Sequence, residues 1–314
     1  MRKCVGVLVM LCLMASSVFA TNTFQTSGSW GIASNWSAGV VPADTEQVKI
    51  KTGITCNLDV PAGTFTLNKV TVGTAATAEG VLNVVSGGSI TSVLEIQVGD
   101  DGGYLGRVTQ SGGTVNLTGT SSKDSKLEVG YKQGVGYYTI FGGSIVGDAL
   151  YSQLQVGASG GTGGTGTFTV QGPAPSISVS KLYVGASTST AQYTGNGTLA
   201  YEINGGVSSI NAWSVYIDPT GLVAAVANLS VTKTGALPTG TIILVNNTGT
   251  SGIVGAFDNV AWGSTMILGG NSYTLTNTYV AGADGLANDI ALIPEPATIA
   301  LLGLGLIALR RNKK

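Results

Sequence analysis

Apolar and polar residues alternate along many short stretches of this chain, and several of these stretches end in the dipeptide Val-Gly. Alternation with a period of two predicts β-strands that bury one face. The stretches recur at similar distances, which indicates internal repeats of the kind that build stacked arrays. The Val-Gly pairs are Val72-Gly73, Val98-Gly99, Val129-Gly130, Val156-Gly157 and Val184-Gly185, at spacings of 26, 31, 27 and 28 residues.

A second glycine signature lies within the repeats and is usually followed by Ser or Thr and then by apolar residues. Because glycine permits positive φ angles, each signature predicts a turn between two short strands. One repeat cannot bury its own apolar face, whereas stacked repeats bury a continuous core. The signatures are Gly87-Gly88, Gly112-Gly113, Gly142-Gly143 and Gly205-Gly206, and Gly172-Pro173 takes the place of the pair in the fourth repeat.

These patterns predict an all-β protein whose residues 21–216 form a parallel β-helix, or β-solenoid, of about five or more coils with end caps. The alternative is an antiparallel β-sandwich in which each Gly-Gly closes a hairpin. Insertions such as Thr118–Asp124 are expected to bulge from a turn of the solenoid. Apolar stretches between residues 217 and 293 predict a further β region that acts as a C-terminal cap.

Two tryptophans, Trp30 and Trp36, stand among turn residues near the start of the repeats. This opening resembles that of bacterial surface β-solenoids of the autotransporter-passenger kind. The resemblance implies that both indole rings cover the apolar interior of the first coil. The alternative is a glycan-stacking platform, because an indole face suits a sugar ring.

The first twenty residues predict a secretory signal peptide. Arg2 and Lys3 precede an uncharged run from Val5 to Met14, and Val18-Phe19-Ala20 offers a small-residue cleavage site. We therefore expect cleavage after Ala20 and export of the remainder.

The last 21 residues combine a strand breaker, an apolar run and a basic end. Pro294, Glu295 and Pro296 stop any preceding element, and Ala297–Leu309 predicts a hydrophobic helix. Thirteen residues at about 1.5 Å each give a span of roughly 20 Å, which is short for a bilayer core. The positive-inside rule keeps the following cluster in the cytoplasm. That cluster is Arg310, Arg311, Lys313 and Lys314.

This order resembles a PEP-CTERM sorting signal, the C-terminal tail of exported bacterial proteins. The resemblance covers residues 294–314 and implies that an exosortase-like membrane transpeptidase recognises Pro294, Glu295 and Pro296 and removes the tail. The helix would then anchor the protein in the membrane only transiently, before it reaches the cell surface or the medium. The alternatives are a permanent tail anchor and a buried C-terminal helix of the fold.

Composition narrows the chemistry that the exported part can perform. Without the signal and the tail, nine basic residues stand against sixteen acidic ones, which argues against nucleic acid as a partner. The chain has no histidine, which excludes Ser-His-Asp sites and the usual zinc sites. Cys56 is the one cysteine left after the signal, so no intramolecular disulfide can form, and it is expected to be a small buried apolar residue.

The acidic residues could form a Ca²⁺ site or a pair of catalytic carboxylates, but a solvated turn or a surface ladder would also explain them. Asp100 and Asp101 could supply oxygens to Ca²⁺, but they lack an ordered ligand spacing and fit a solvated turn. A glycosidase needs two carboxylates about 5 to 10 Å apart. Only Arg107 remains as an arginine for binding a sugar acid, so no catalytic residue, metal or cofactor is expected. The carboxylates that could be proposed are Glu79, Glu95, Glu128 and Glu202, although Glu95 and Glu128 equally fit a ladder on one solvent face.

The sequence therefore predicts an exported, non-enzymatic protein of the cell surface or extracellular matrix, associated with exopolysaccharide or biofilm as a structural or adhesive component. The alternatives are a secreted carbohydrate-active enzyme, either a lyase or a glycosidase, and a glycan-binding module on the same scaffold.

Overall fold

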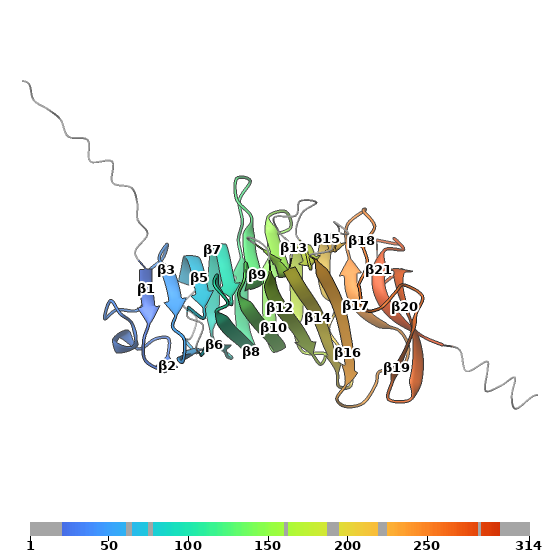
Figure 1. Cartoon of the computed structure of the whole chain (residues 1–314), viewed down its shortest axis with the longest axis horizontal. Coiled ribbons are helices and arrows are strands. Elements are labelled where there is room, and N and C mark those ends of the chain that lie inside the picture. The colour runs from blue at the N-terminus through green and yellow to red at the C-terminus, as the bar shows by residue number, and fades with distance from the viewer. Residues whose placement is uncertain are drawn as a thin grey trace, which may run out of the picture.

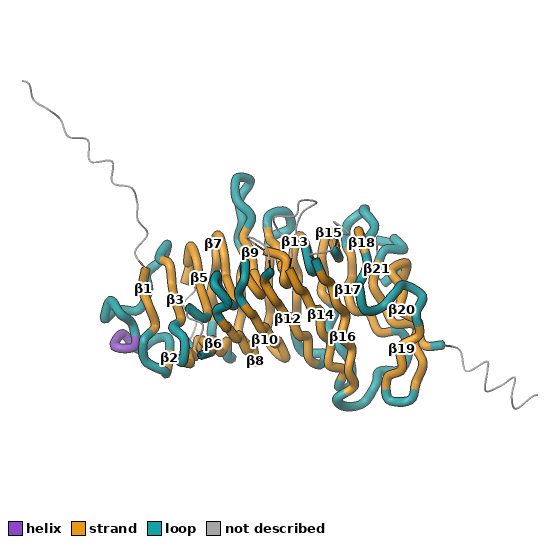
Figure 2. Tube along the Cα trace, viewed as in Figure 1, coloured by secondary structure: helices purple, strands orange, loops and turns teal. Residues whose placement is uncertain are grey.

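The computed structural model describes residues 21–60, 65–74, 78–159, 163–186, 195–218, 225–281 and 284–295. These residues form an elongated body of 21 strands, with one 3₁₀ turn, η1 (Ala33–Asn35), at its N-terminal end (Figures 1 and 2). Among the described residues, no helix is long and apolar enough to cross a membrane. The expected signal peptide and the hydrophobic helix 297–309 lie outside the described ranges.

From β3 to β18, each strand pairs in parallel with a strand one coil earlier, so the chain winds through three faces of a solenoid. The predicted parallel β-helix of about five or more coils is confirmed. The antiparallel sandwich is wrong, because the Gly-Gly pairs lie at bends between two faces rather than in hairpins. Gly112-Gly113, for example, lies inside one continuous strand that pairs first with one neighbour and then with another.

The first face contains eight successive coil segments in parallel register. It consists of β2 (Gly28–Ser29), β4 (Thr55–Leu58), β6 (Glu79–Val84), the first halves of β8 (Leu105–Leu117) and β10 (Val135–Gly147), β12 (Gly164–Gln171), β14 (Gly195–Ile203) and β16 (Val226–Lys233).

The second face is short and includes the later halves of β8 and β10. Its other members are the starts of β5 (Phe65–Val72), β7 (Ser89–Val98), β13 (Ser176–Val184) and β15 (Ile210–Ile217), and the end of β17 (Ile242–Asn247).

The third face carries the Val-Gly signatures. It consists of β1 (Thr21–Phe24), β3 (Gln47–Ile50), the ends of β5, β7, β13 and β15, β9 (Ser125–Tyr131), β11 (Ser152–Ser159) and β18 (Val254–Gly255).

Inward side chains from successive coils stack on one another and form the core. Each full burial of such a side chain contributes about 1.5 to 3 kcal/mol, and one coil alone could not provide it. One column on the third face illustrates the register, and all of its members are at most 3% exposed. It contains Val70, Ile96, Leu127, Leu154, Leu182 and Val215.

The Val-Gly signature marks the corner between the third face and the first face. Gly130 has a φ of 79°, which suits glycine, and it turns the chain out of β9. The following strand then passes close to that turn at Gly136, where a β-carbon would collide with the backbone of Val98 and Gly130. Two backbones thus touch at every corner, which explains why glycine recurs there.

The parallel pairing continues past residue 217, and an antiparallel unit then closes the body. β16 and β17 extend the first and second faces by one further coil. β19 (Thr265–Leu268), β20 (Asn271–Tyr279) and β21 (Asp289–Pro294) form a meander, and β21 also pairs with β17. This unit covers the exposed backbone edge of the last coil at the end opposite to β1 (Figure 1).

Candidate functional site

The first two residues of the Pro-Glu-Pro triplet belong to the folded body. Pro294 ends β21 opposite Tyr273, at a strand end where its missing N–H is tolerated. The backbone N–H of Glu295 donates to the carbonyl of Ser272 at 3.0 Å, and the Thr265 hydroxyl donates to the Glu295 carboxylate at 2.8 Å. The hairpin of β19 and β20 therefore holds the start of the motif.

The rest of the predicted sorting and processing residues lie outside the described ranges. These are Ala20, Pro296 and the basic cluster Arg310, Arg311, Lys313 and Lys314.

Both N-terminal tryptophans lie inside the first coil. Trp30 is 0% exposed and Trp36 is 3% exposed, and the Trp36 indole N–H donates to the carbonyl of Trp30 at 2.8 Å. The two rings and that of Phe24 pack edge to face at centroid distances of 4.7 and 4.9 Å. Neither indole face is available to a sugar ring, so the structure favours the capping interpretation.

The Asp100-Asp101 pair lies in an exposed turn after β7. The Lys132 ammonium is 3.0 Å from the carboxylate of Asp101, and Gly102 and Gly103 continue the turn with φ angles of 80°. In the described part of the chain, no group of three or more His, Cys, Asp or Glu side chains is placed to hold a metal.

The four candidate carboxylates separate onto two faces. Glu79 lies on the first face, where it forms an ion pair with Arg107 at 2.9 Å, and Glu202 lies in a later strand of the same face. Glu95 and Glu128 lie in adjacent coils of the third face. The side-chain amide of Gln97 donates to both of their carboxylates, at 3.0 Å and 2.9 Å, so the two accepting oxygens are within 5.9 Å of each other.

Outward side chains of the third face form two parallel polar columns. Parallel pairing places matched residues of successive coils about 4.8 Å apart, so their side chains interact along each column. The inner column is almost fully covered, and even the carboxylate-bearing Glu128 is only 1% exposed. The outer column contains Lys69, Glu95, Lys126, Gln153 and Lys181, and the inner column contains Thr71, Gln97, Glu128 and Gln155.

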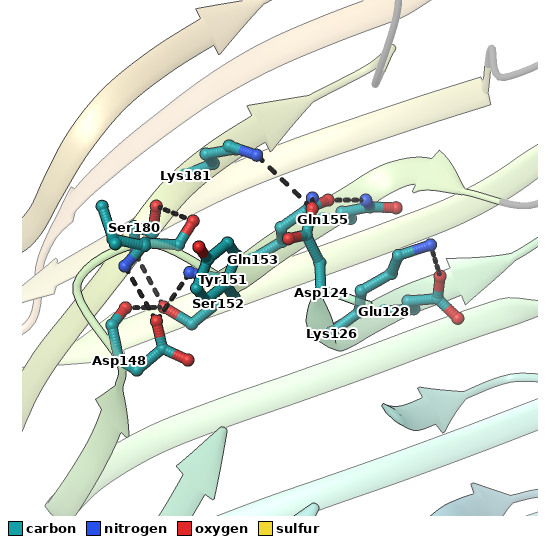
Figure 3. A network of polar contacts seen from close by, with 11 residues as sticks. Asp124, Lys126, Glu128, Asp148, Tyr151, Ser152, Gln153, Gln155, Ser180 and Lys181 are labelled. Carbon is teal, nitrogen blue, oxygen red and sulfur yellow. Dashed lines mark hydrogen bonds and ion pairs between the residues drawn. The ribbon is translucent and has the colours of Figure 1, made fainter. Parts of the chain in front are cut away.

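Opposite charges meet within these columns and across them. Lys69 pairs with Glu95 at 3.4 Å, and Lys126 pairs with Glu128 at 3.9 Å. Lys181 reaches Asp124 at 3.4 Å, and Gln153 also donates to Asp124 (Figure 3). Asp124 belongs to the predicted insertion 118–124, so these contacts fasten the insertion to the third face.

A hollow of about 460 Å³ lies between the outer column and the insertion, and we call it the third-face groove. The insertion forms a small hairpin closed by a bridge between Thr120 and Lys123, which stands out from the body beside β9 (Figure 1). The groove is lined by Gln47, Lys69, Leu94, Glu95, Lys123, Asp124 and Lys126.

Tyr131 lies over the inner column close to the groove. The Lys69 ammonium is 5.5 Å from its ring centroid, and that of Lys132 is 5.2 Å away. Burial, together with the nearby Glu128 carboxylate, raises the pKa of the Tyr131 hydroxyl. The tyrosine therefore stays neutral and keeps a hydroxyl that can donate a hydrogen bond.

A tight turn at the start of β11 completes the polar network (Figure 3). The Asp148 carboxylate accepts hydrogen bonds from the backbone N–H groups of Leu150 and Tyr151, at 2.8 and 2.6 Å. The Ser180 hydroxyl of the next coil donates to the carbonyl of Leu150 at 3.0 Å. The corner that leads into the third face is thereby fixed in position.

Glu95 and Glu128 were predicted from the sequence as candidate carboxylates, whereas the lysines around them were not. A signal was present, because a polar or charged residue stands three places before the Val of each Val-Gly pair, beginning with Lys69 and Glu95. Only the coil register shows that these positions form one column.

No curated protein and no solved structure is significantly similar to the chain. A family model does match its C-terminal end: residues 292–314 fit the PEP-CTERM protein-sorting motif. The matched segment begins inside β21 and includes the Pro-Glu-Pro triplet. The chain is thus a β-solenoid that carries a PEP-CTERM sorting motif, which implies an exported protein that passes through a membrane and is processed by an exosortase.

Proposed function

We propose that this protein is a non-enzymatic component of the cell surface or extracellular matrix, where it acts as a structural or adhesive partner of exopolysaccharide. The observation that carries the proposal is the sorting motif at residues 292–314, joined directly to the solenoid. An exosortase would release the solenoid from its transient anchor and pass it outward.

The body supports this role. A closed solenoid with capped ends resists edge-to-edge association, and the outer column of its third face presents polar and charged side chains at regular intervals. A long polymer with its own repeat can contact such a surface at several points at once, which raises avidity without a deep pocket.

Intact mass and C-terminal peptide mapping of the protein from the envelope and the medium of producing cells test the sorting step. We expect the chain to end close to Pro294–Pro296 and to lack the basic cluster. A chain that persists through Lys314 in both fractions would be a permanent tail anchor and would contradict the proposal.

Fractionation of the extracellular matrix tests the second step. We expect the processed protein to sediment with exopolysaccharide and to be released when the polysaccharide is digested. Cells that make no exopolysaccharide serve as the control, and in their cultures the protein should be free in the medium. A protein that is equally free in both cultures has no matrix role.

A carbohydrate-active enzyme is the second candidate, because two carboxylate oxygens of Glu95 and Glu128 are at most 5.9 Å apart, and a retaining glycosidase uses two carboxylates roughly 5 to 5.5 Å apart. The enzyme hypothesis predicts new reducing ends or unsaturated products from acidic or neutral polysaccharides. Turnover that is lost in Glu95→Gln would establish it, and the non-enzymatic proposal would then fail.

A further inference from the structure

We propose that the third-face groove is a binding site for an anionic polysaccharide, and that its lysines recognise the carboxylate groups of uronate sugars. The inference rests on the proposed function, because it names the kind of polysaccharide that the surface protein would contact. The residues proposed to bind the glycan are therefore those of the groove and not the two buried tryptophans, Trp30 and Trp36.

The first argument is the distribution of charge. Residues 21–295 carry nine basic side chains against sixteen acidic ones, so the protein as a whole repels anions. Five of the nine nevertheless gather on one of the three faces. Lys49, Lys69, Lys126 and Lys181 lie in its strands, and Lys123 lies in the hairpin that borders it.

The second argument is the balance of charge within the groove. Its lining holds three lysines against the two carboxylates of Glu95 and Asp124. Lys69 and Lys126 pair with glutamates, whereas within the described residues Lys123 forms no ion pair. An incoming carboxylate would therefore meet the uncompensated ammonium of Lys123 beside that of Lys69, which is paired with Glu95 and whose side chain is only 27% exposed. Partial burial lowers the local dielectric and strengthens such attraction.

The third argument is shape and hydrogen bonding. The groove has about 460 Å³ of space, which is within the range of small-ligand sites and suits a short run of sugar rings. Gln47 lines it, and together with the carboxylates of Glu95 and Asp124 it can exchange hydrogen bonds with sugar hydroxyls. The hairpin wall is held by Lys181 and Gln153, so the site is formed before any ligand arrives.

Other anionic polymers fit less well. A membrane surface and a nucleic-acid duplex both present extended arrays of phosphates, which are bound by broad basic patches. Here the third-face groove, with one unpaired lysine among its described residues, lies on an acidic body. The chemistry suits a sparsely charged chain that also has many hydroxyls.

The test is titration of the exported protein, recovered from producing cells, with polygalacturonate and with dextran as the neutral probe. We expect saturable binding of polygalacturonate, at least tenfold tighter than that of dextran. Because salt screens exposed charges, the affinity should fall when the salt concentration rises from about 0.05 M to about 0.5 M.

Matched variants locate the site. Lys123→Gln should weaken binding of polygalacturonate by about fivefold. The double variant Lys69→Gln/Lys123→Gln should weaken it by more than tenfold. Lys123→Glu should weaken binding more than Lys123→Gln does. Lys123 is exposed and forms no ion pair within the described residues, and the Lys69–Glu95 pair is partly exposed, so these changes should shift the melting temperature only slightly. Lys233→Gln, on the first face, is the control and should bind like the wild type.

Three results would overturn the inference: equal affinity for both polysaccharides, wild-type affinity in the folded double variant, or displacement by inorganic phosphate at the same concentration as uronate. Failure here is distinct from failure of the proposed function. A protein that sediments with the matrix but does not prefer polygalacturonate refutes the groove alone. A protein that binds polygalacturonate but is neither processed nor found in the matrix refutes the proposed function alone.

Discussion

Gly136 shows how one side chain, or its absence, sets the distance between coils. Its backbone has no positive φ, so the reason for glycine is space: a β-carbon would meet the carbonyl of Val98 and the backbone N of Gly130. We expect Gly136→Ala to destabilise the fold by about 1–3 kcal/mol, as overpacking does elsewhere. Chemical denaturation measures this change.

Gly252→Ala is the matched control, because a β-carbon at residue 252 would meet nothing within 4 Å. Its free energy of unfolding should stay within about 0.5 kcal/mol of the wild type. Equal stability of the two variants would contradict the close approach of backbones at the corners.

Cys56 is buried, and this burial raises the pKa of its thiol. Because the thiolate is the reactive form, we expect iodoacetamide to leave Cys56 unmodified at pH 8.5 in the folded protein and to alkylate it fully in guanidinium. Mass spectrometry distinguishes the two states. Rapid alkylation without denaturant would show that β4 opens readily.

For single residues, the sequence showed at which intervals the repeats recur but not which side chains contact each other. The recurrence of Val-Gly was visible, and it predicted turns correctly. The bridge from Gln97 to Glu95 and Glu128 was not visible, because 31 residues separate Gln97 from Glu128 and only the coil register brings them together. The burial of Trp30 likewise depends on how the first coil closes over it.

Among the elements, the hairpin of β19 and β20 has a role that the sorting motif alone does not suggest. It holds Glu295 through the Ser272 carbonyl and the Thr265 hydroxyl. We expect Thr265→Val to release the carboxylate, to speed hydrogen exchange of the Glu295 amide and to speed processing of the tail. Exchange detected by mass spectrometry and a time course of tail removal measure both effects.

Thr278→Val is the control for this variant. Its hydroxyl contacts Thr276 on the same strand, and within the described residues it forms no hydrogen bond with Pro294 or Glu295. It should leave exchange and processing unchanged. If Thr265→Val also changes neither, the hairpin does not restrain the motif.

The elements themselves were largely predictable, since alternation and glycine turns are local signals. The region between residues 217 and 293, where a further β region was expected, contains β20 and most of β21. The pairing of β21 with β17 was not predictable, because its paired residues are 45 to 50 positions apart in the sequence and their patterns fit many partners. The inserted hairpin could be located, but its attachment through Asp124 depends on the neighbouring coils.

For the whole molecule, two buried tyrosines make stability depend on alkaline pH. Tyr138 and Tyr201 are at most 1% exposed, and their hydroxyls donate to Gln110 and to the Leu244 carbonyl, each at 2.6 Å. Burial raises the pKa of both above the ordinary value. The folded state therefore keeps protons that the unfolded state loses above pH ~10.

The two tyrosines should accordingly leave the free energy of unfolding independent of pH below pH ~10. Above pH ~10 this free energy should fall by about 1.4 kcal/mol per pH unit for each tyrosine. Denaturant titrations between pH 8 and 11 measure the slope. Tyr201→Phe should remove one tyrosine's share of it while lowering stability at neutral pH. A slope that is the same in both proteins would mean that Tyr201 ionises within the fold.

The continuity of β21 with the Pro-Glu-Pro triplet has one more consequence. Pro294 and Glu295 belong to two features at once: they complete the terminal sheet, and they lie in the matched sorting motif. A tail taken from another exported protein would thus replace the end of β21 with a different sequence. Such a chimaera would fold only if the new strand end still pairs in the terminal sheet and closes the last coil.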